Sequence, residues 1–193
     1  MANIYDTEIE IFGPLFSKEK NIFSLLKVNK KEVNQMVFFL KDKRKDFRIK
    51  WDEGKNYFEF INKSKLGEQR NVREEFSVRI NKAQATSFLF ILKSIGLYEG
   101  YGSRTRRIDF SYNNIIWSLK YGSGIGDYWE AEASQLLKRK LANSKKVLNY
   151  LNKCAYKMHL KVWSPQEFKL IRETRKKKRK VVSIEEFFRN VIS

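Results

Sequence analysis

The two stretches TEIEI, residues 7–11, and WEAEA, residues 129–133, carry the pattern that decides the expected fold. Acidic and apolar residues alternate in both, which is the period of a β-strand with one polar and one apolar face. Each strand therefore places two carboxylates on one face, about 7 Å apart along the chain. The pairs are Glu8 with Glu10 and Glu130 with Glu132. Two strands at opposite ends of the first 133 residues are thus predicted to carry paired carboxylates.

The same alternation recurs between these stretches, and turn signals separate its segments. The polar faces of the predicted strands carry Arg48 and Lys50 (45–51), Glu59 and Lys63 (56–63), Arg73, Glu75 and Arg79 (70–80), and Ser118 and Lys120 (115–121). Turns are expected at Asp52-Glu53-Gly54, at Asn113-Asn114 and over 122–126. Helical spacing of apolar residues predicts helices over 31–40, 82–95 and 133–160.

Charges of both signs on the polar faces leave two architectures open. The apolar faces are aromatic and aliphatic, so helices must cover them. With that face covered, the sheet can close around its charged face and form a polar channel. Alternatively, the sheet stays open and its charged face is solvated. The periodicity itself does not choose between these two.

The paired glutamates indicate a metal site. Carboxylates that cluster repel one another unless a hard divalent cation lies among them, and oxygen ligands suit Mg²⁺ or Mn²⁺. Arginine and lysine side chains across a channel would hold phosphates, and metal and cations together offset the charge that develops in phosphoryl transfer. The expected metal ligands are Glu8, Glu10, Glu130 and Glu132.

Composition excludes several classes of protein. The 193 residues carry a formal charge of +18, and 42% are hydrophobic, so a folded chain with an anionic partner is expected. One cysteine, Cys154, and one histidine, His159, exclude a disulfide framework and a Cys/His zinc site. No apolar run suits a membrane span, and the acids near residue 1 do not suit a signal peptide. We expect a soluble intracellular protein, cytoplasmic or nuclear, and its Lys-, Asn-, Ile- and Phe-rich composition suits a virus-encoded or low-GC source.

The positive charge is concentrated in the last third of the chain. Residues 133–193 hold 17 basic and 4 acidic residues, whereas residues 1–132 hold 23 and 18. The run Arg175, Lys176, Lys177, Lys178, Arg179 and Lys180 lies between two capping boxes, at 164–167 and 183–186. This pattern suits a solvated helix face and linker, a contact with RNA or DNA, or a nuclear import signal. We expect a tunnel-like domain over 1–160 and a basic helical tail over 161–193.

Five short motifs resemble, in order, those of the CYTH superfamily, the triphosphate tunnel metalloenzymes. Residues 7–11 resemble its ExExK opening, and Arg73-Glu74-Glu75 resembles its R-x-E strand. Residues 92–96 (LKSIG) resemble its L-x-x-L-G helix, and Arg104-Thr105-Arg106 resembles its K-x-R. Residues 124–132 (GIGDYWEAE) resemble its closing G-L-G-x-[FY]-x-E-x-E. The resemblance covers residues 3–132.

The resemblance implies an α+β fold, a closed eight-stranded antiparallel β-tunnel with helices outside, which binds a triphosphate and Mg²⁺ or Mn²⁺. It implies catalytic roles for the four glutamates together with Arg73 and Glu75. The expected phosphate-binding residues are Arg48, Lys50, Lys63, Arg73, Arg79, Arg104, Arg106 and Lys120.

Two departures from the family pattern concern the phosphate contacts. Phe12 stands where the lysine of ExExK is usual, and Lys120 stands where small-molecule members often have an aspartate. Arg104 and Arg106 also share a strand face with Ile108 and Phe110. Both arginines therefore need a β-bulge to point inward; without one, Arg107 and Asp109 face the tunnel.

The first functional hypothesis is metal-dependent removal of the γ-phosphate from the 5′-triphosphate of RNA, as in mRNA capping. The basic tail favours RNA because a long polyanion can use charge far outside a small tunnel. Capping would make a guanylyltransferase a partner, and no membrane partner is expected. Two alternatives stay open: a small-molecule triphosphatase (tripolyphosphate, thiamine triphosphate, NTP) or class IV adenylate cyclase, and a non-catalytic polyanion-binding module.

Overall fold

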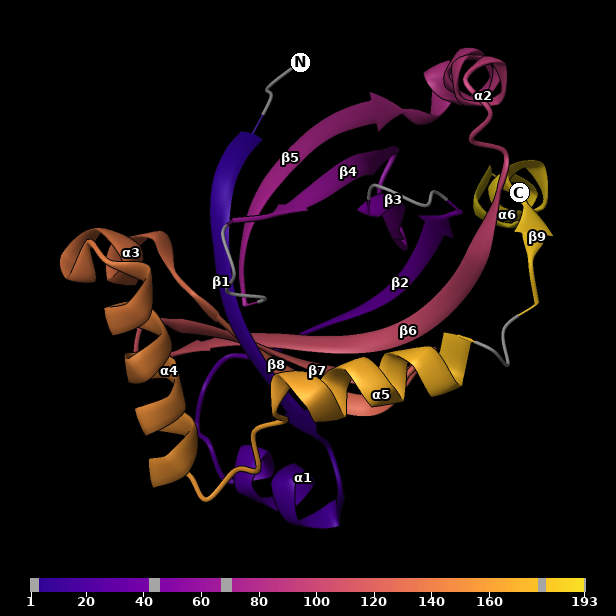
Figure 1. Cartoon of the computed structure of the whole chain (residues 1–193). Coiled ribbons are helices and arrows are strands. Elements are labelled where there is room, and N and C mark those ends of the chain that lie inside the picture. The colour runs from indigo at the N-terminus through magenta and orange to yellow at the C-terminus, as the bar shows by residue number, and fades with distance from the viewer. Residues whose placement is uncertain (1–3, 42–45, 67–70, 177–179, 193) are drawn as a thin grey trace.

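Eight antiparallel strands close into a barrel within the described residues of this computed structural model, which are 4–41, 46–66, 71–176 and 180–192. The strands are β1 (Ile4–Pro14), β2 (Lys31–Leu40), β3 (Asp46–Asp52), β4 (Tyr57–Lys65), β5 (Val72–Asn81), β6 (Glu99–Tyr112), β7 (Ile115–Ser123) and β8 (Gly126–Ala133). Their order around the barrel is β2-β3-β4-β5-β1-β8-β7-β6, and the pairing of β2 with β6 closes it. The closed alternative and the α+β class are therefore confirmed (Figure 1).

The prediction of a helix over 31–40 is wrong, because these residues form β2. This strand pairs with β6 over its whole length and with β3 over its second half. Its outer face buries Phe38 and Leu40, whereas its inner face buries Gln35. Since both faces are buried, the sequence shows apolar residues on both sides and hides the alternation of a strand.

The helices lie outside the barrel and cover two apolar clusters (Figure 1). They are α1 (Ser17–Ser24), α2 (Ala85–Ser94) after the 3₁₀ turn η1 (Lys82–Gln84), α3 (Gln135–Leu141), α4 (Ser144–Lys157), α5 (Pro165–Lys176) and α6 (Ile184–Ile192), which follows the two-residue strand β9 (Val182–Ser183). Phe23 of α1 and Leu151 of α4 pack with Trp117 and Trp129 in the first cluster. The second cluster joins α2 and α6 to the outer faces of β2 to β5. The charged faces of the strands are left to line the barrel interior.

The single helix expected over 133–160 is divided into α3 and α4. Ala142 has a φ of 49°, in the left-handed region, and ends α3. The side chain of Asn143 then accepts hydrogen bonds from the backbone N–H groups of Lys145 and Lys146, which caps the start of α4. The apolar stripe is nevertheless a core face as expected, because Leu137 and Leu151 are buried in the first cluster.

The segment after α4 returns to one end of the barrel. The backbone N–H of Trp163 donates to the carbonyl oxygen of Phe12 at 2.8 Å. Gly13 makes this close approach possible, because a Cβ atom there would overlap the carbonyl oxygen of Lys161. The capping box at Ser164 and Glu167 forms as predicted and starts α5, which crosses in front of the barrel opening in Figure 1. Within the described residues, every helix is too short or too polar to span a membrane.

Candidate metal and phosphate site in the barrel lumen

The strand register brings the predicted glutamates together on the inner face of the barrel. β1 and β8 are neighbours, and Glu10 pairs with Glu132 across them. Carboxylate oxygens of Glu8, Glu10 and Glu130 all lie within 4.8 Å of one another. Glu8 and Glu10 are buried, at 6% and 1% exposure. Four residues that are far apart in the sequence thus form one acidic wall, with Glu132 beside the three that converge.

Basic side chains from neighbouring strands hold this wall. The ammonium of Lys63 lies 2.6 Å from Glu8 and 2.8 Å from Glu75. The Arg73 guanidinium lies 3.3 Å from Glu8 and contacts Glu10 as well. The ammonium of Lys120 contacts Glu130. In this structure, Lys63, Arg73 and Lys120 neutralise carboxylates. The same three side chains lie where a phosphate that enters the lumen would contact them.

Two buried oxygens of this wall share one guanidinium group. Glu8 Oε2 and Glu10 Oε1 both lie against the Arg73 guanidinium, yet among the described residues neither accepts a hydrogen bond, and Arg73 Nε donates none. Buried polar atoms with incomplete hydrogen bonding are costly, so they suit a ligand that completes them. Convergent carboxylate oxygens are the ligands that Mg²⁺ and Mn²⁺ prefer. The residues present therefore fit a hard divalent cation, and they do not choose between these two metals.

The pKa values show how crowded the negative charge is. Burial, together with repulsion from Glu8 and Glu130, raises the pKa of Glu132 to about 7. Burial would also raise the pKa of Glu130, but the attraction of Lys120 outweighs it and lowers this pKa to about 2. Negative charge is therefore crowded in the wall even though Lys138 lies 3.9 Å from Glu132, and a divalent cation would relieve the repulsion.

The opposite side of the lumen supplies further predicted phosphate ligands. Arg48 forms an ion pair with Asp46 at 2.6 Å, and Lys50 forms one with Glu59 at 3.2 Å. Burial would lower the pKa of Arg48, but its bond with Asp46 raises it, so this side chain stays charged. Arg79 lies at the rim instead, where it is half exposed and contacts Glu59 at 3.4 Å. Of the eight predicted phosphate ligands, Arg48, Lys50, Lys63, Arg73 and Lys120 face the lumen.

Arg104 and Arg106 do not face the lumen. β6 pairs with β2 in unbroken register, so the bulge that would turn them inward is absent from that pairing. Arg104 is exposed, and the Arg106 guanidinium donates to Glu32 at 2.9 Å on the outer surface. Arg107 takes the inward position and donates to Asp109 at 2.8 Å. The alternation with Ile108 and Phe110 was the signal that identified Arg107.

An aromatic group lies at the end of the lumen next to α5. Phe12 stacks on Phe168 of α5 with their ring centroids 4.6 Å apart, and it contacts Tyr128 at 6.4 Å. Trp163 stacks on Phe168 from the other side, at 5.8 Å. We call Phe12, Tyr128, Trp163 and Phe168 the aromatic end. Phe12, at the position of the usual lysine, thus contacts a helix instead of offering a phosphate contact.

The segment 161–193 was expected to lie apart from the tunnel, but its first helix packs against the barrel. Arg175 and Lys176 end α5, and Lys180 is exposed. Residues 177–179 of the basic run lie outside the described residues. Further on, Phe187 and Phe188 of α6 are buried in the second apolar cluster. The domain boundary at residue 160 stays a prediction.

Solved structures with a similar fold are numerous. A candidate adenylyl cyclase from Hippeastrum with a dominant triphosphatase activity is 16% identical, with a TM-score of 0.58, and the match covers 87% of this chain and 95% of that one. For a candidate adenylate cyclase from Vibrio parahaemolyticus the identity is 15% and the TM-score 0.57, over 94% and 97%. The Mediator head module of Schizosaccharomyces pombe contains a chain with 8% identity and a TM-score of 0.60, over 81% and 98%.

These likenesses show the fold, since each identity is low. No family model matches the sequence, and no curated protein matches it either. The class that the fold and the lumen define is an eight-stranded antiparallel tunnel of the kind seen in these candidate cyclases and in the triphosphatase. The third structure belongs to an assembly of a different kind, so the same tunnel fold also occurs there.

Proposed function

We propose that this chain is a metal-dependent hydrolase that removes the γ-phosphate from a triphosphate end, with the 5′-triphosphate of RNA as its substrate, as in mRNA capping. One observation carries the proposal. The carboxylates of Glu8, Glu10 and Glu130 converge within 4.8 Å inside a closed barrel, directly against Lys63, Arg73 and Lys120. A site that holds both a hard cation and several phosphate ligands suits phosphoryl transfer.

In this proposal, Glu8, Glu10 and Glu130 hold Mg²⁺ or Mn²⁺, with Glu132 as the neighbouring fourth carboxylate. The bound metal supplies positive charge that offsets the charge on the transferred phosphoryl group. Arg73 and Lys63 move from the carboxylates to the phosphate oxygens, and Lys120 does the same beside Glu130. Arg48, Lys50 and Arg107 complete the ring of cations from the other side of the lumen.

The reaction is an in-line displacement. The oxygen of a water molecule bonds to the γ-phosphorus while the bond from that phosphorus to the β–γ bridging oxygen breaks. The bridging oxygen keeps the electron pair, and a proton of the water passes to solvent. The products are inorganic phosphate and a diphosphate end. Once they contact the bound triphosphate, these cations already face the phosphate oxygens, so they offset the charge that shifts to the leaving oxygen.

The basic C-terminal segment supports RNA as the substrate. Residues 133–193 carry a net charge of +13, and binding of a long polyanion strengthens with each phosphate that is neutralised. A diphosphate RNA end is what a guanylyltransferase takes, so such an enzyme is the partner that this proposal implies.

A small-molecule triphosphatase or a class IV adenylate cyclase is the second candidate. It is favoured by the similar structures described as cyclases and by the triphosphatase activity of the Hippeastrum protein. A third candidate is a non-catalytic polyanion-binding module. Phe12 favours this one, because it places an aromatic ring where a phosphate contact is usual and stacks it on α5.

The deciding experiment measures the products of triphosphate-ended RNA, ATP and tripolyphosphate in parallel, with Mg²⁺ or Mn²⁺. Phosphate release that is fastest on RNA supports the first proposal. Release that is equal or faster on ATP or tripolyphosphate supports the small-molecule triphosphatase, and formation of cyclic AMP supports the cyclase. Binding of RNA without any product supports the non-catalytic module.

A further inference from the structure

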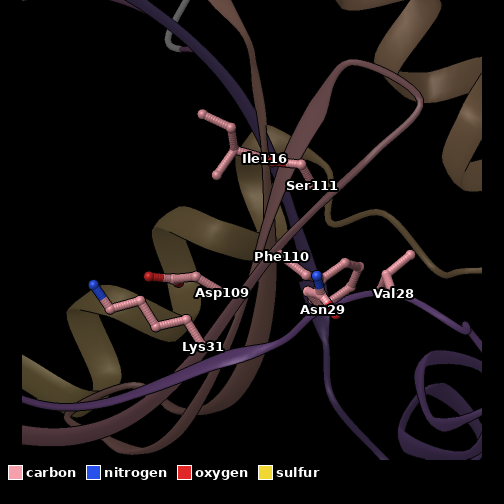
Figure 2. Close-up of a pocket in the computed structure, with 7 residues that line it drawn as sticks. All are labelled: Val28, Asn29, Lys31, Asp109, Phe110, Ser111 and Ile116. Carbon is pink, nitrogen blue, oxygen red and sulfur yellow. The ribbon is translucent and has the colours of Figure 1, made fainter.

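A cavity of about 520 Å³ opens at the rim of the barrel where β2 begins (Figure 2). Its volume is in the range of sites for small organic ligands. The cavity is lined by Val28, Asn29, Lys31, Asp109, Phe110, Ser111 and Ile116. Lys31 and Asp109 pair in register across β2 and β6, and their side chains point the same way in Figure 2.

Strand register places part of the cavity lining next to the acidic wall. Ile116 pairs in register with Glu132, and Ser118 pairs with Glu130. The Ser118 hydroxyl donates to Asp109 at 2.7 Å, so the polar contacts run from the wall to the cavity. All these residues except Phe110 lie on the inner face or at its rim. A ligand that extends from the glutamates toward Ile116 and Asp109 would therefore come to this cavity.

The other direction along the lumen leads to the aromatic end. Phe12 of β1 pairs with Glu130 of β8, whereas Ile116 of β7 pairs with Glu132, nearer the cavity. The Phe12 ring already stacks on Phe168 of α5. The organic part of a triphosphate-ended substrate would have to displace that stack in order to lie there. At the cavity end it meets space instead, and this difference points to one orientation of the substrate.

The cavity walls suit a nucleoside. Val28 and Ile116 offer apolar surface for the face of a base, and the Asn29 side chain offers both donors and an acceptor for its edge. The Asp109 carboxylate uses one acceptor position on each oxygen, for Ser118 and Arg107, and retains others for ribose hydroxyls. Lys31 forms no ion pair within the described part of the chain, so its ammonium is available for the next phosphate of an RNA chain. An inorganic tripolyphosphate would leave these groups unused.

We propose that this rim cavity holds the first nucleoside of the substrate, so that the site takes nucleoside triphosphates or RNA ends in preference to inorganic tripolyphosphate. This inference rests on the proposed function for the position of the triphosphate. It adds the orientation of the substrate and names the residues that recognise its organic part, which the acidic wall does not specify.

Binding tests this proposal without hydrolysis. Affinities are measured by calorimetry in Mg²⁺ with methylene-bridged analogues of ATP and of tripolyphosphate, in which carbon replaces the bridging oxygens so that no hydrolysis occurs. The variant Ser111→Trp fills the cavity from an exposed strand position, and Ser87→Trp makes the same change on the exposed face of α2 as a control. Ser111→Trp should weaken ATP binding about tenfold and change tripolyphosphate binding less than twofold. Ser87→Trp should change neither. Asn29→Ala, on a loop, gives a milder version of the test if Ser111→Trp does not fold.

Equal weakening of both ligands, or unchanged ATP binding in both cavity variants, would overturn the proposal. Absence of ATP binding to the wild-type protein would overturn it as well. Failure of the proposed hydrolase function is a separate result, because it shows as absent phosphate release in Mg²⁺ or Mn²⁺. If ATP binds through the cavity but no phosphate is released, the cavity assignment stands and the hydrolase does not. Weaker binding of RNA by Lys31→Gln at unchanged ATP affinity would place this lysine on the second phosphate.

Discussion

Two groups of carboxylates face the same lumen, and their surroundings differ. The glutamate group (Glu8, Glu10, Glu130 and Glu132) contains two buried oxygens that lie against one Arg73 guanidinium without accepting a hydrogen bond from the described residues, and the pKa of Glu132 is raised to about 7. The aspartate group (Asp52 and Asp109) lies on β3 and β6. Asp52 accepts hydrogen bonds from Gln35 at 2.7 Å and Lys55 at 2.9 Å, and Asp109 accepts from Arg107 and Ser118.

The pKa of Asp52 moves in the direction opposite to that of Glu132. Burial would raise the pKa of Asp52, but the bonds from Gln35 and Lys55 outweigh it and lower the pKa below its ordinary value of 3.8. A carboxylate with a complete set of donors stabilises the fold in its charged form. A carboxylate crowded by other carboxylates stores unfavourable energy that a cation can release. The difference separates carboxylates that suit a metal from carboxylates that accept hydrogen bonds from the protein's own side chains.

Removing one member of the glutamate group should have the largest effect. Glu10→Gln keeps the size of the side chain but removes a carboxylate that the metal needs, so hydrolysis should fall at least about 100-fold. The melting temperature of the metal-free protein should not fall, because the change relieves repulsion. Mg²⁺ should raise the melting temperature of the wild type and not that of the variant.

The control for this change is Glu99→Gln, a half-exposed carboxylate that forms an ion pair with Lys41 at 3.3 Å, which should leave activity and metal binding unchanged. Loss of stability in Glu10→Gln without loss of activity would assign Glu10 to the structural class, alongside Asp52.

Arg73 contacts the glutamate group, and both the charge and the planar shape of its guanidinium should contribute to turnover. Bidentate contact with a phosphate is a property of the guanidinium group, so Arg73→Lys should lower turnover about tenfold or more although the charge is kept. Steady-state kinetics and thermal melting on the same sample measure this. An unchanged rate with a lowered melting temperature would make Arg73 a structural partner of Glu8 and Glu10.

The aspartate group should affect stability instead. Asp52→Asn should reduce the free energy of unfolding by about 1–2 kcal/mol at pH 7, because bonds to a charged acceptor are lost. The folded-state pKa of Asp52 is lowered, so the folded protein binds fewer protons than the unfolded chain in acid. The stabilisation is therefore complete above about pH 4 and is lost as the pH falls through the folded-state pKa.

Denaturant unfolding of wild type and Asp52→Asn at pH 7 and pH 3 measures this difference. The two stabilities should approach each other at the lower pH. A difference in unfolding free energy that stays constant with pH would show that the Asp52 charge does not stabilise the fold. The contrast between the two carboxylate groups would then depend on the glutamates.

The smallest effect is expected outside both groups. Neutralising residues 175–180 should weaken RNA binding and reduce its salt dependence by about 0.7 log units per lost phosphate contact. Hydrolysis of ATP should stay within about twofold, since ATP reaches only the lumen. Titration of RNA at several salt concentrations measures the slope. Equal loss on RNA and ATP would show that this segment acts through α5 on the tunnel itself.

Much of the barrel could be predicted from sequence, because strand alternation is a local property. The charged faces at Glu8 and Glu10, at Arg73 and Glu75, and at Glu130 and Glu132 identified three strands and their inner sides. The turn at Asn113-Asn114 was visible because both residues take the left-handed conformation that asparagine tolerates, with φ of 55° and 58°. Strand alternation also predicted that the glutamates of the acidic wall share strand faces, and the structure places those faces in the lumen.

Two errors came from faces that local sequence does not distinguish. β2 carries apolar residues on both sides, since Phe38 packs under α6 while Val37 and Gln35 line the lumen, and this pattern resembled a helix. In β6, three basic residues occur among 104–107, and only the strand register shows that Arg107 points inward. A shift of one residue moves a side chain to the other face of a strand.

The sequence by itself determined which residues alternate, where the chain turns, and that two carboxylate pairs sit on strand faces, because these follow from backbone geometry over a few residues. Only the tertiary structure decided that the sheet closes through β2 and β6, that Lys63 and Arg73 meet Glu8, and that Phe168 covers Phe12. Those contacts join residues tens of positions apart or more, and they depend on register and closure, which no local pattern contains. Whether an inward-facing carboxylate is bonded by several donors, as in Asp52, or crowded, as in Glu132, is settled by those distant neighbours, since desolvation by itself would raise the pKa of both.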